Sequence, residues 1–449
     1  MTHVLRVAAL VVLIGGLTPA AAQERLELFT WIGNQPRAIE VDGSVSGFGA
    51  IGRVTSLTQL PPGGVPFKPP TVIAGGRYAA WTGPSGGHPG WDVFVFDRVT
   101  RRVSVLPAQM LPPGAYGPDV VVLTTVGADP RRPRLFLAAH RFTTPVSHVV
   151  WAIDLDGGPP VAMWSDPALP FISGFAYARD VDEIFLLANL DTVVVLDGVT
   201  GREKRRWPAT GAGLVVDPGG RVAWIDQGPQ IVAVDAATGS QIASTVGHSP
   251  ILDEQRRVLL SVAGEDEFLR AHDPLALTTL GSVRIDFSPS LRGMFASTSV
   301  LPGRWMTGAY VVRSESRRLD GVCNAMVVDV YDPNGTRRDT ADILRIIDAT
   351  SGGCTAYPVL FRSPFAPSGL TAAVAGRDVT LAWRDPGDAT HFELEFGFAP
   401  GQRAGSLRLG RANSLTIPGV PPGTYYLRVK AVNAVGGSPV SNEVRVVVP

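Results

Sequence analysis

The chain has 449 residues, too long for one ordinary domain, and 45% of them are hydrophobic, enough for packed cores. Basic and acidic residues balance at 40 each, so the sequence lacks the positive charge on which nucleic-acid binding and attraction to anionic membranes depend. The 50 glycines and 38 prolines are scattered along the chain, which favours many short strands over a disordered segment.

The first 22 residues have the parts of a secretory signal peptide. A weakly basic start that includes Arg6 precedes an apolar run at residues 7–17, and small residues at 20–22 form a cleavage site before Gln23. The run is too short to span a bilayer. We therefore expect an exported protein, periplasmic or extracellular, with no transmembrane segment. A buried N-terminal helix is the alternative.

A short unit recurs along the central part of the chain: an apolar strand that ends in Asp, followed by a tight turn. Its best copies are VVVLD-GVTG at residues 193–201 and IVAVD-AATG at residues 231–239. The aspartates of these copies and of a weaker third copy lie 38 residues apart, at Asp197, Asp235 and Asp273. In such a turn the Asp carboxylate accepts hydrogen bonds from backbone N–H groups, and Gly supplies a positive φ. Further copies end at Asp97, Asp154 and Asp332.

A second strand, introduced by a turn with Pro, Gly or Arg, precedes most copies. A period of 38 residues is long enough for about four such short strands, as in a propeller blade. A single four-stranded sheet cannot bury both faces, and such units must stack on one another, radially in a propeller. The repeat resembles the quinoprotein-like and surface-layer-type β-propellers of bacteria. We predict an all-β fold in which residues 23–362 form a six- or seven-bladed β-propeller. Seven blades are favoured, with the N-terminal strand closing the last one. A sandwich array or a β-solenoid is the alternative.

A proline-bearing linker at residues 363–367 precedes a second all-β segment at residues 368–449. Apolar and polar residues alternate through PPGTYYLRVKAVN at residues 421–433, as in a strand with one wet face. The segment strongly resembles the fibronectin type III domain, a β-sandwich that would act as a spacer or adhesion module. The resemblance implies that Trp383 is the core tryptophan and Tyr425 the tyrosine corner, both structural.

Gly83-Pro84-Ser85-Gly86-Gly87 matches the GxSxG pattern of serine hydrolases, and His88 follows it. A nucleophile elbow requires a helix directly after the serine. Here Pro89 and Gly90 come next and a strand follows, so we predict a hairpin loop and no catalytic residue.

Metal-binding patterns are equally weak. His140 and His148 lack zinc spacing with acidic or Cys partners and would converge only by an accident of the tertiary fold. Two acidic clusters, Asp180-Asp182-Glu183 and Glu265-Asp266-Glu267, make Ca²⁺ the one candidate cofactor. Solvated hairpin tips are the favoured interpretation of both. No cofactor-binding or metal-ligating residue is therefore predicted, and most of the nine tryptophans are expected to pack between blades.

Cys323 and Cys354 are the two cysteines of the chain. In an oxidising compartment they are expected to form a disulfide, with two separate buried thiols as the alternative. They lie 31 positions apart, whereas many quinone-dependent propellers carry a vicinal disulfide. The resemblance therefore does not carry quinoprotein dehydrogenase activity to this chain.

The sequence thus favours an exported, non-enzymatic binding or scaffold protein whose propeller presents a face to a protein or carbohydrate ligand. An enzyme stays open as the alternative: a lyase or hydrolase of sugars or peptides in the propeller channel. Its site would need titratable residues from several blades, and the long stretches between Asp97 and Asp154 and between Asp273 and Asp332 could supply them. The oligomeric state is not predicted.

Overall fold

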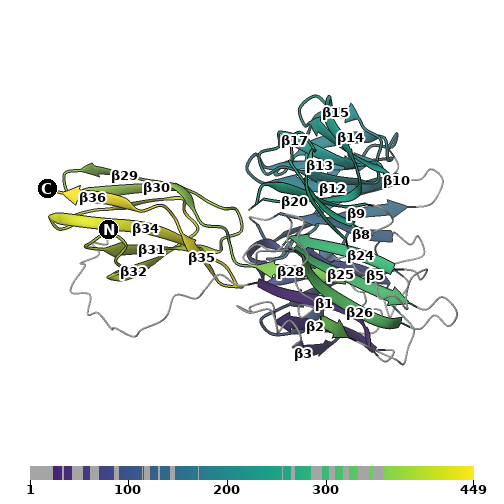
Figure 1. Cartoon of the computed structure of the whole chain (residues 1–449), viewed down its shortest axis with the longest axis horizontal. Helices are drawn as coiled ribbons and strands as arrows, with labels where there is room; N and C mark the ends of the chain where they lie inside the picture. The colour runs from purple at the N-terminus through teal and green to yellow at the C-terminus, as the bar shows by residue number, and fades with distance from the viewer. Residues whose placement is uncertain are drawn as a thin grey trace. The chain divides into compact units, whose positions relative to one another are not determined.

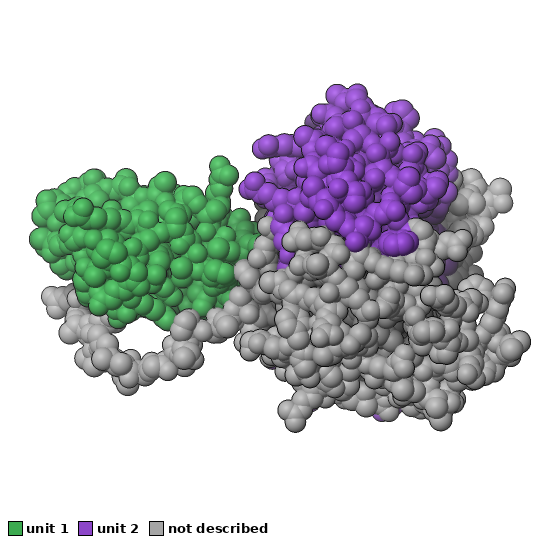
Figure 2. Space-filling view, in the orientation of Figure 1, with its two compact units in different colours: residues 1–22, 363–449 green, residues 23–362 purple. Residues whose placement is uncertain are grey.

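The computed structural model divides the chain into two compact units, Gln23–Arg362 and Ser363–Pro449 (Figures 1 and 2). Nearly every regular element is a strand, and the two exceptions in the described segments are short 3₁₀ turns, η1 (Ala74–Gly76) and η2 (Ala108–Met110). The all-β prediction is confirmed. The structure describes residues 24–32, 35–42, 54–60, 70–84, 90–113, 115, 122–129, 132–141, 147–169, 171–254, 256–263, 268–284, 296–302, 309–316, 323–331, 344–346 and 357–449.

Predictions made for residues 1–22, for Glu265, Asp266 and Glu267, and for Cys354 fall outside these ranges. In the described part of the chain, no helix is long and apolar enough to cross a membrane.

The larger unit contains seven four-stranded antiparallel sheets, counted over the described ranges. In six of them, four strands consecutive in the chain lie side by side in order. The first three are β4 (Thr71–Val72), β5 (Tyr78–Pro84), β6 (Trp91–Asp97) and β7 (Arg102–Val105); β8 (Val122–Ala128), β9 (Arg134–Arg141), β10 (Ser147–Asp154) and β11 (Val161–Trp164); and β12 (Ile172–Ala178), β13 (Glu183–Ala188), β14 (Thr192–Asp197) and β15 (Glu203–Pro208).

The next three follow the same rule. They are β16 (Gly213–Val216), β17 (Val222–Asp226), β18 (Gln230–Asp235) and β19 (Gln241–Val246); β20 (His248–Asp253), β21 (Val258–Ala263), β22 (Phe268–His272) and β23 (Thr279–Arg284); and β24 (Ala296–Pro302), β25 (Ala309–Ser316), β26 (Cys323–Tyr331) and β27 (Leu344–Ile346). The predicted period therefore corresponds to one sheet, and each Asp-ending copy described is its third strand.

The seventh sheet joins the two ends of the unit. Its order is β28-β1-β2-β3, and β28 pairs antiparallel with β1 from Glu24↔Arg362 to Phe29↔Tyr357. In each sheet, one of the two edge strands contacts an edge strand of the next sheet. These strands are, in order, β4, β8, β12, β16, β20, β24 and β28, and β28 contacts β4 again. The sheets thus form a closed, propeller-like ring, stitched by strands from both ends of the unit. These strands are β1 (Glu24–Ile32), β2 (Gln35–Asp42), β3 (Val54–Gln59) and β28 (Tyr357–Arg362).

Strand β13 shows why the sheets stack. All six of its residues are buried, although neighbouring side chains on a strand point to opposite faces. Leu186 belongs to a core shared with Phe136 of the preceding sheet. Phe185 belongs to a separate core shared with Ile225 of the following sheet. A strand that is apolar on both faces needs a neighbour on each side, and the ring supplies both.

The turn after each Asp-ending strand has the predicted hydrogen bonds. In the β18–β19 turn, Asp235 Oδ1 accepts from the backbone N of Ala237 at 3.0 Å and of Thr238 at 2.9 Å. Gly239 then adopts a φ of 75°. The β14–β15 turn repeats the pattern from Asp197, and the turn chemistry read from the sequence is confirmed there.

The smaller unit is a two-sheet β-sandwich. One sheet has the order β29-β30-β33, and the other has the order β32-β31-β34-β35 with β36 also paired to β34. Buried residues from both sheets, among them Leu381 and Val429, share one core. Its strands are β29 (Ser368–Ala375), β30 (Asp378–Arg384), β31 (His391–Gly397), β32 (Gly405–Leu409), β33 (Ser414–Ile417), β34 (Gly423–Val432), β35 (Gly437–Val440) and β36 (Val444–Val448).

Two residues singled out for the sandwich have structural positions. Trp383 is 4% exposed, and its ring centroid lies 5.4 Å from that of Phe392 in the opposite sheet. The Tyr425 hydroxyl donates to the Pro421 carbonyl oxygen at 3.0 Å, so this hydrogen bond links β34 to the residues just before it.

Candidate functional site

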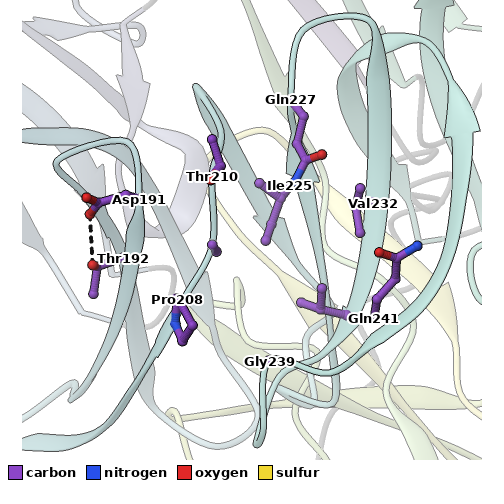
Figure 3. Close-up of a pocket in the computed structure, with 11 residues that line it drawn as sticks. Asp191, Thr192, Pro208, Thr210, Ile225, Gln227, Val232, Gly239 and Gln241 are labelled. Atoms are coloured by element: carbon purple, nitrogen blue, oxygen red, sulfur yellow. Dashed lines mark hydrogen bonds between the residues drawn. The ribbon is translucent and has the colours of Figure 1, made fainter.

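An open cleft of about 540 Å³ lies between two neighbouring sheets of the larger unit, β12–β15 and β16–β19 (Figure 3). One wall comes from the start of β14, the end of β15 and the connection that follows it. The other comes from β17, β18 and the start of β19. The residues that line the cleft are Asp191, Thr192, Pro208, Ala209, Thr210, Ile225, Gln227, Val232, Val234, Gly239 and Gln241.

The floor of the cleft is apolar because it is the margin of the core between the sheets. Val232 and Val234 of β18 and Ile225 of β17 are buried and belong to the core that contains Phe185. Trp207 of β15 is 4% exposed and packs behind the β18–β19 turn. A Cβ on Gly239 would lie 2.8 Å from the Trp207 ring, so only glycine lets the two sheets approach this closely here.

The β13–β14 turn positions the acidic end of the cleft. Asn189 and Leu190 have φ of 53° and 62°, the left-handed pair of a tight hairpin turn. The backbone N of Gly211 donates to the Leu190 carbonyl oxygen at 2.9 Å, and that of Ala209 donates to the Asp191 carbonyl oxygen at 2.7 Å. These bonds tie the turn to the connection after β15 and fix Asp191 at the edge of the cleft.

Asp191 is the one ionisable residue among the described residues that line the cleft. Its carboxylate accepts from the Asn189 side-chain amide at 3.3 Å. It also accepts from the Thr192 hydroxyl at 2.8 Å (Figure 3), and both donors are neutral. At the other wall, the Gln230 side-chain amide donates to Gln227 Oε1 at 2.9 Å, which fixes the orientation of Gln227. The cleft therefore offers hydroxyl, amide and carboxylate groups above an apolar floor.

Other carboxylates of the same sheet are neutralised by arginine. Glu183 accepts from Arg205 Nη2 at 2.7 Å, and Lys204 Nζ lies 2.7 Å from its other oxygen. Burial opposes ionisation of Glu183, but the hydrogen bonds from Arg205 and Lys204 outweigh it and hold its pKa below the ordinary value. Asp182 accepts from Arg132 Nη2 at 2.9 Å and from the Tyr177 hydroxyl. The Glu183 contacts lie within one sheet, the Arg132–Asp182 contact joins two sheets, and none of these residues lines the cleft.

This pairing also bears on the acidic cluster Asp180-Asp182-Glu183, for which the sequence favoured a solvated hairpin tip and left Ca²⁺ as the alternative. Glu183 is held by Arg205 and Lys204, whereas Asp182 is held by Arg132, so the two carboxylates serve different cations. Asp180, with its side chain 60% exposed, lies beside Arg179. Over the described residues, no group of three or more His, Cys, Asp or Glu side chains could hold a metal ion.

The histidine pair differs from expectation. His140 and His148 face each other directly across β9 and β10, with ring centroids 6.3 Å apart, and both are buried. The prediction that only an accident of the tertiary fold could bring them together is wrong, because the register of one hairpin does so. The ring of Trp164 lies 5.3 Å from that of His148, so the pair sits in an aromatic setting.

A buried Ser–His pair also escaped the sequence analysis. Ser261 Oγ of β21 lies 2.8 Å from His272 Nε2 of β22, and the Thr279 hydroxyl lies 3.4 Å from Nδ1. Burial, and then the charge of Arg270, lower the pKa of His272 below its ordinary value. Ser261 is 1% exposed and His272 0%, so no substrate reaches them as they stand. The adjacent-strand placement of Ser261 and His272 was the signal that could have revealed the pair.

The GxSxG segment lies where a hairpin was predicted. β5 and β6 pair antiparallel as far as Pro84↔Trp91, so the segment between them joins adjacent strands. Ser85 and His88 lie outside the described residues. Three tryptophans of the larger unit are core residues: Trp81, Trp207 and Trp224 are each at most 4% exposed. Trp224 Nε1 also donates to the Pro274 carbonyl oxygen of the next sheet at 2.7 Å.

No family model matches the chain, and no curated protein matches its sequence. Solved structures resemble it in shape. AztD from Citrobacter koseri, in its apo form, is 12% identical over 75% of this chain and 98% of its own, with a TM-score of 0.45. A chain of a mitotic checkpoint complex is 12% identical over 70% of this chain and 86% of its own, with a TM-score of 0.43. An Fn3-like protein from Clostridium thermocellum is 23% identical over 19% of this chain and 94% of its own, with a TM-score of 0.18. These similarities identify no family or activity for this chain.

Proposed function

We propose that this protein is an exported binding protein whose larger unit takes a ligand in the cleft between the β12–β15 and β16–β19 sheets. Its seven sheets are the seven blades of a β-propeller. Residues 368–449 form a fibronectin type III-like module that acts as a spacer or adhesion domain. Residues 1–22 are the signal peptide that directs export, and the protein acts in the periplasm or outside the cell.

The make-up of the cleft carries this proposal. Its volume of about 540 Å³ suits a bound ligand, and a few polar groups converge above an apolar floor, as in ligand sites generally. The described lining residues include Asp191, two threonines and two glutamines, and no imidazole, thiol or amine. A single carboxylate among neutral groups, with no second titratable residue in that lining, favours recognition of a ligand over chemistry on it.

The test is a thermal-shift screen of the purified protein against oligosaccharides, peptidoglycan fragments, peptides and metal ions. A ligand that binds the folded state stabilises it by about 2.7 kcal/mol at a concentration 100 times its Kd, so the melting temperature rises. We expect a shift with one ligand class and full recovery of that ligand by mass spectrometry. Consumption of the ligand would instead establish an enzyme.

A pair of variants ties the shift to the cleft. Thr210→Trp places an indole on the exposed wall of the cleft and is expected to abolish the shift. Leu280→Trp, at a side chain 57% exposed on β23 and outside the cleft lining, is the matched control and should leave it intact. An undiminished shift in Thr210→Trp would refute the proposed site.

A further inference from the structure

The acidic end of the cleft lacks a cation of its own. Asp191 accepts only from the neutral groups of Asn189 and Thr192, and no ion pair to it occurs in the described segments. In the same sheet Glu183 and Glu203 are each held by arginine at 2.7 and 2.6 Å. An unneutralised carboxylate at the edge of a cleft favours a cationic ligand group, because a charge-assisted hydrogen bond is about twice as strong as a neutral one.

The residue before Asp191 in the β13–β14 turn is an exposed leucine, which adjoins the cleft lining in the sequence. Leu190 is 42% exposed at a φ of 62°, a conformation that a leucine rarely adopts. The turn bonds of Leu190 and Asp191 to the connection after β15 hold it there. An exposed apolar side chain next to a carboxylate matches a lysine or arginine side chain, whose aliphatic stem covers apolar surface while its charge stays at the tip.

The length and floor of the cleft suit an extended peptide. The lining runs along β18, from Gln227 just before the strand to Gly239 and Gln241 just after it. Six residues of β-strand span roughly 20 Å at about 3.4 Å per residue. Val232 and Val234 on the floor are 5% and 4% exposed, so such a peptide would meet only the edges of their side chains, and the glutamine amides can bond its backbone. Among the described lining residues there is no aromatic ring on which a sugar could stack.

We propose, resting on the proposed function, that the cleft binds an extended peptide with a basic side chain whose cationic group pairs with Asp191. The peptide lies along β18, and the stem of its lysine or arginine packs on Leu190.

The probes are three fluorescein-labelled, C-terminally amidated pentapeptides, Ala-Val-X-Val-Ala, with Lys, Gln or Glu at X. Fluorescence anisotropy with the purified protein is expected to show the Lys peptide binding about tenfold more tightly than the Gln peptide, with the Glu peptide weakest. Asp191→Asn, a substitution of the same size at an exposed side chain, should bring the Lys and Gln peptides to equal affinity. Asp180→Asn, at an exposed carboxylate outside the cleft lining, should leave the tenfold preference unchanged.

The outcomes separate this inference from the proposed function. Equal affinity for the Lys and Gln peptides, with both lost in Thr210→Trp, would overturn the basic-peptide inference and support the cleft as a binding site. A second outcome would lead to the same conclusion: none of the peptides binds, an oligosaccharide such as cellohexaose does, and Thr210→Trp abolishes that binding. The basic-peptide inference would then be overturned, and the cleft would be supported as a binding site. Peptide binding that survives Thr210→Trp undiminished would overturn both.

Discussion

The indole of Trp207 packs directly on Gly239, so that a side chain at position 239 would stand 2.8 Å from the ring. The two residues belong to consecutive sheets, Trp207 to β15 and Gly239 to the β18–β19 turn. The same relationship recurs one sheet earlier, where a Cβ on Gly201 would stand 2.4 Å from the Met163 carbonyl oxygen. The glycine of the repeat is therefore needed for two reasons: it adopts the positive φ of its own turn, and its lack of a side chain lets the preceding sheet pack closely against it.

Replacement of Gly239 by alanine is expected to lower the free energy of unfolding by about 3 kcal/mol. Of this, about 1–2 kcal/mol comes from a side chain at a left-handed φ and the rest from overpacking against Trp207. Chemical denaturation followed by tryptophan fluorescence measures the loss. The variant should still fold, because the turn bonds to Asp235 are kept.

Gly228→Ala is the control for strain without overpacking. Gly228 has a φ of 86°, but no atom lies within 4 Å of where its Cβ would stand. The expected loss is about 1–2 kcal/mol from the backbone alone. Equal losses in the two variants would show that contact with Trp207 contributes nothing.

The turns could be predicted from the sequence because their chemistry is local. An Asp, two backbone N–H groups and a residue with positive φ all fall within five positions. The structure adds that glycine is not obligatory there, since Arg101 and Leu277 adopt φ of 56° and 55° at the same place in weaker copies. Each gains a compensating contact: Arg101 lies over the Phe96 ring at 5.0 Å, and Leu277 is 3% exposed.

The cleft could not be predicted because its walls come from two periods of the repeat. Asp191 and Gln241 lie 50 positions apart in the sequence and meet only when consecutive sheets stack. Neither belongs to the repeated Asp-x-x-Thr-Gly positions that drew attention to the fold. His140 and His148 are the opposite case, since eight positions across a hairpin were enough, and the strand register could have been considered.

The predicted disulfide has a direct test. Cys323→Ser should lower the melting temperature of the oxidised protein, by an amount equivalent to about 3 kcal/mol for a loop of about thirty residues. The loss arises because the bond restricts the unfolded chain. In the presence of dithiothreitol the variant and the wild type should melt together. If the melting temperatures of the variant and the wild type differ equally with and without dithiothreitol, the disulfide is ruled out and two separate thiols are favoured.

Glu183 should make the stability depend on pH. Its folded pKa lies below the ordinary value of 4.5, so its contribution is complete above that value and is lost as the pH falls through the folded pKa. At pH 7, Glu183→Gln is expected to cost about 2 kcal/mol, because Arg205 and Lys204 lose a charged partner. The difference from wild type should shrink steadily in denaturation curves from pH 5 to pH 3. A constant difference over that range would rule out the ion pairs as its cause.

Ser261→Ala tests whether the buried Ser–His pair is structural. The substitution removes the hydroxyl 2.8 Å from His272 Nε2 inside the sheet, and the expected loss is about 1–2 kcal/mol. Ser244→Ala, on the exposed outer strand β19, should change stability by less than about 0.5 kcal/mol.

Because the pKa of His272 is lowered on folding, the wild type should also lose stability as the pH falls below 6.5, where the unfolded imidazole takes up a proton first. A structural serine shielded to 1% exposure should give no adduct with diisopropyl fluorophosphate. An adduct at Ser261, detected by mass spectrometry in the folded protein, would show that the strand opens to admit a reagent and would restore a hydrolase as a candidate.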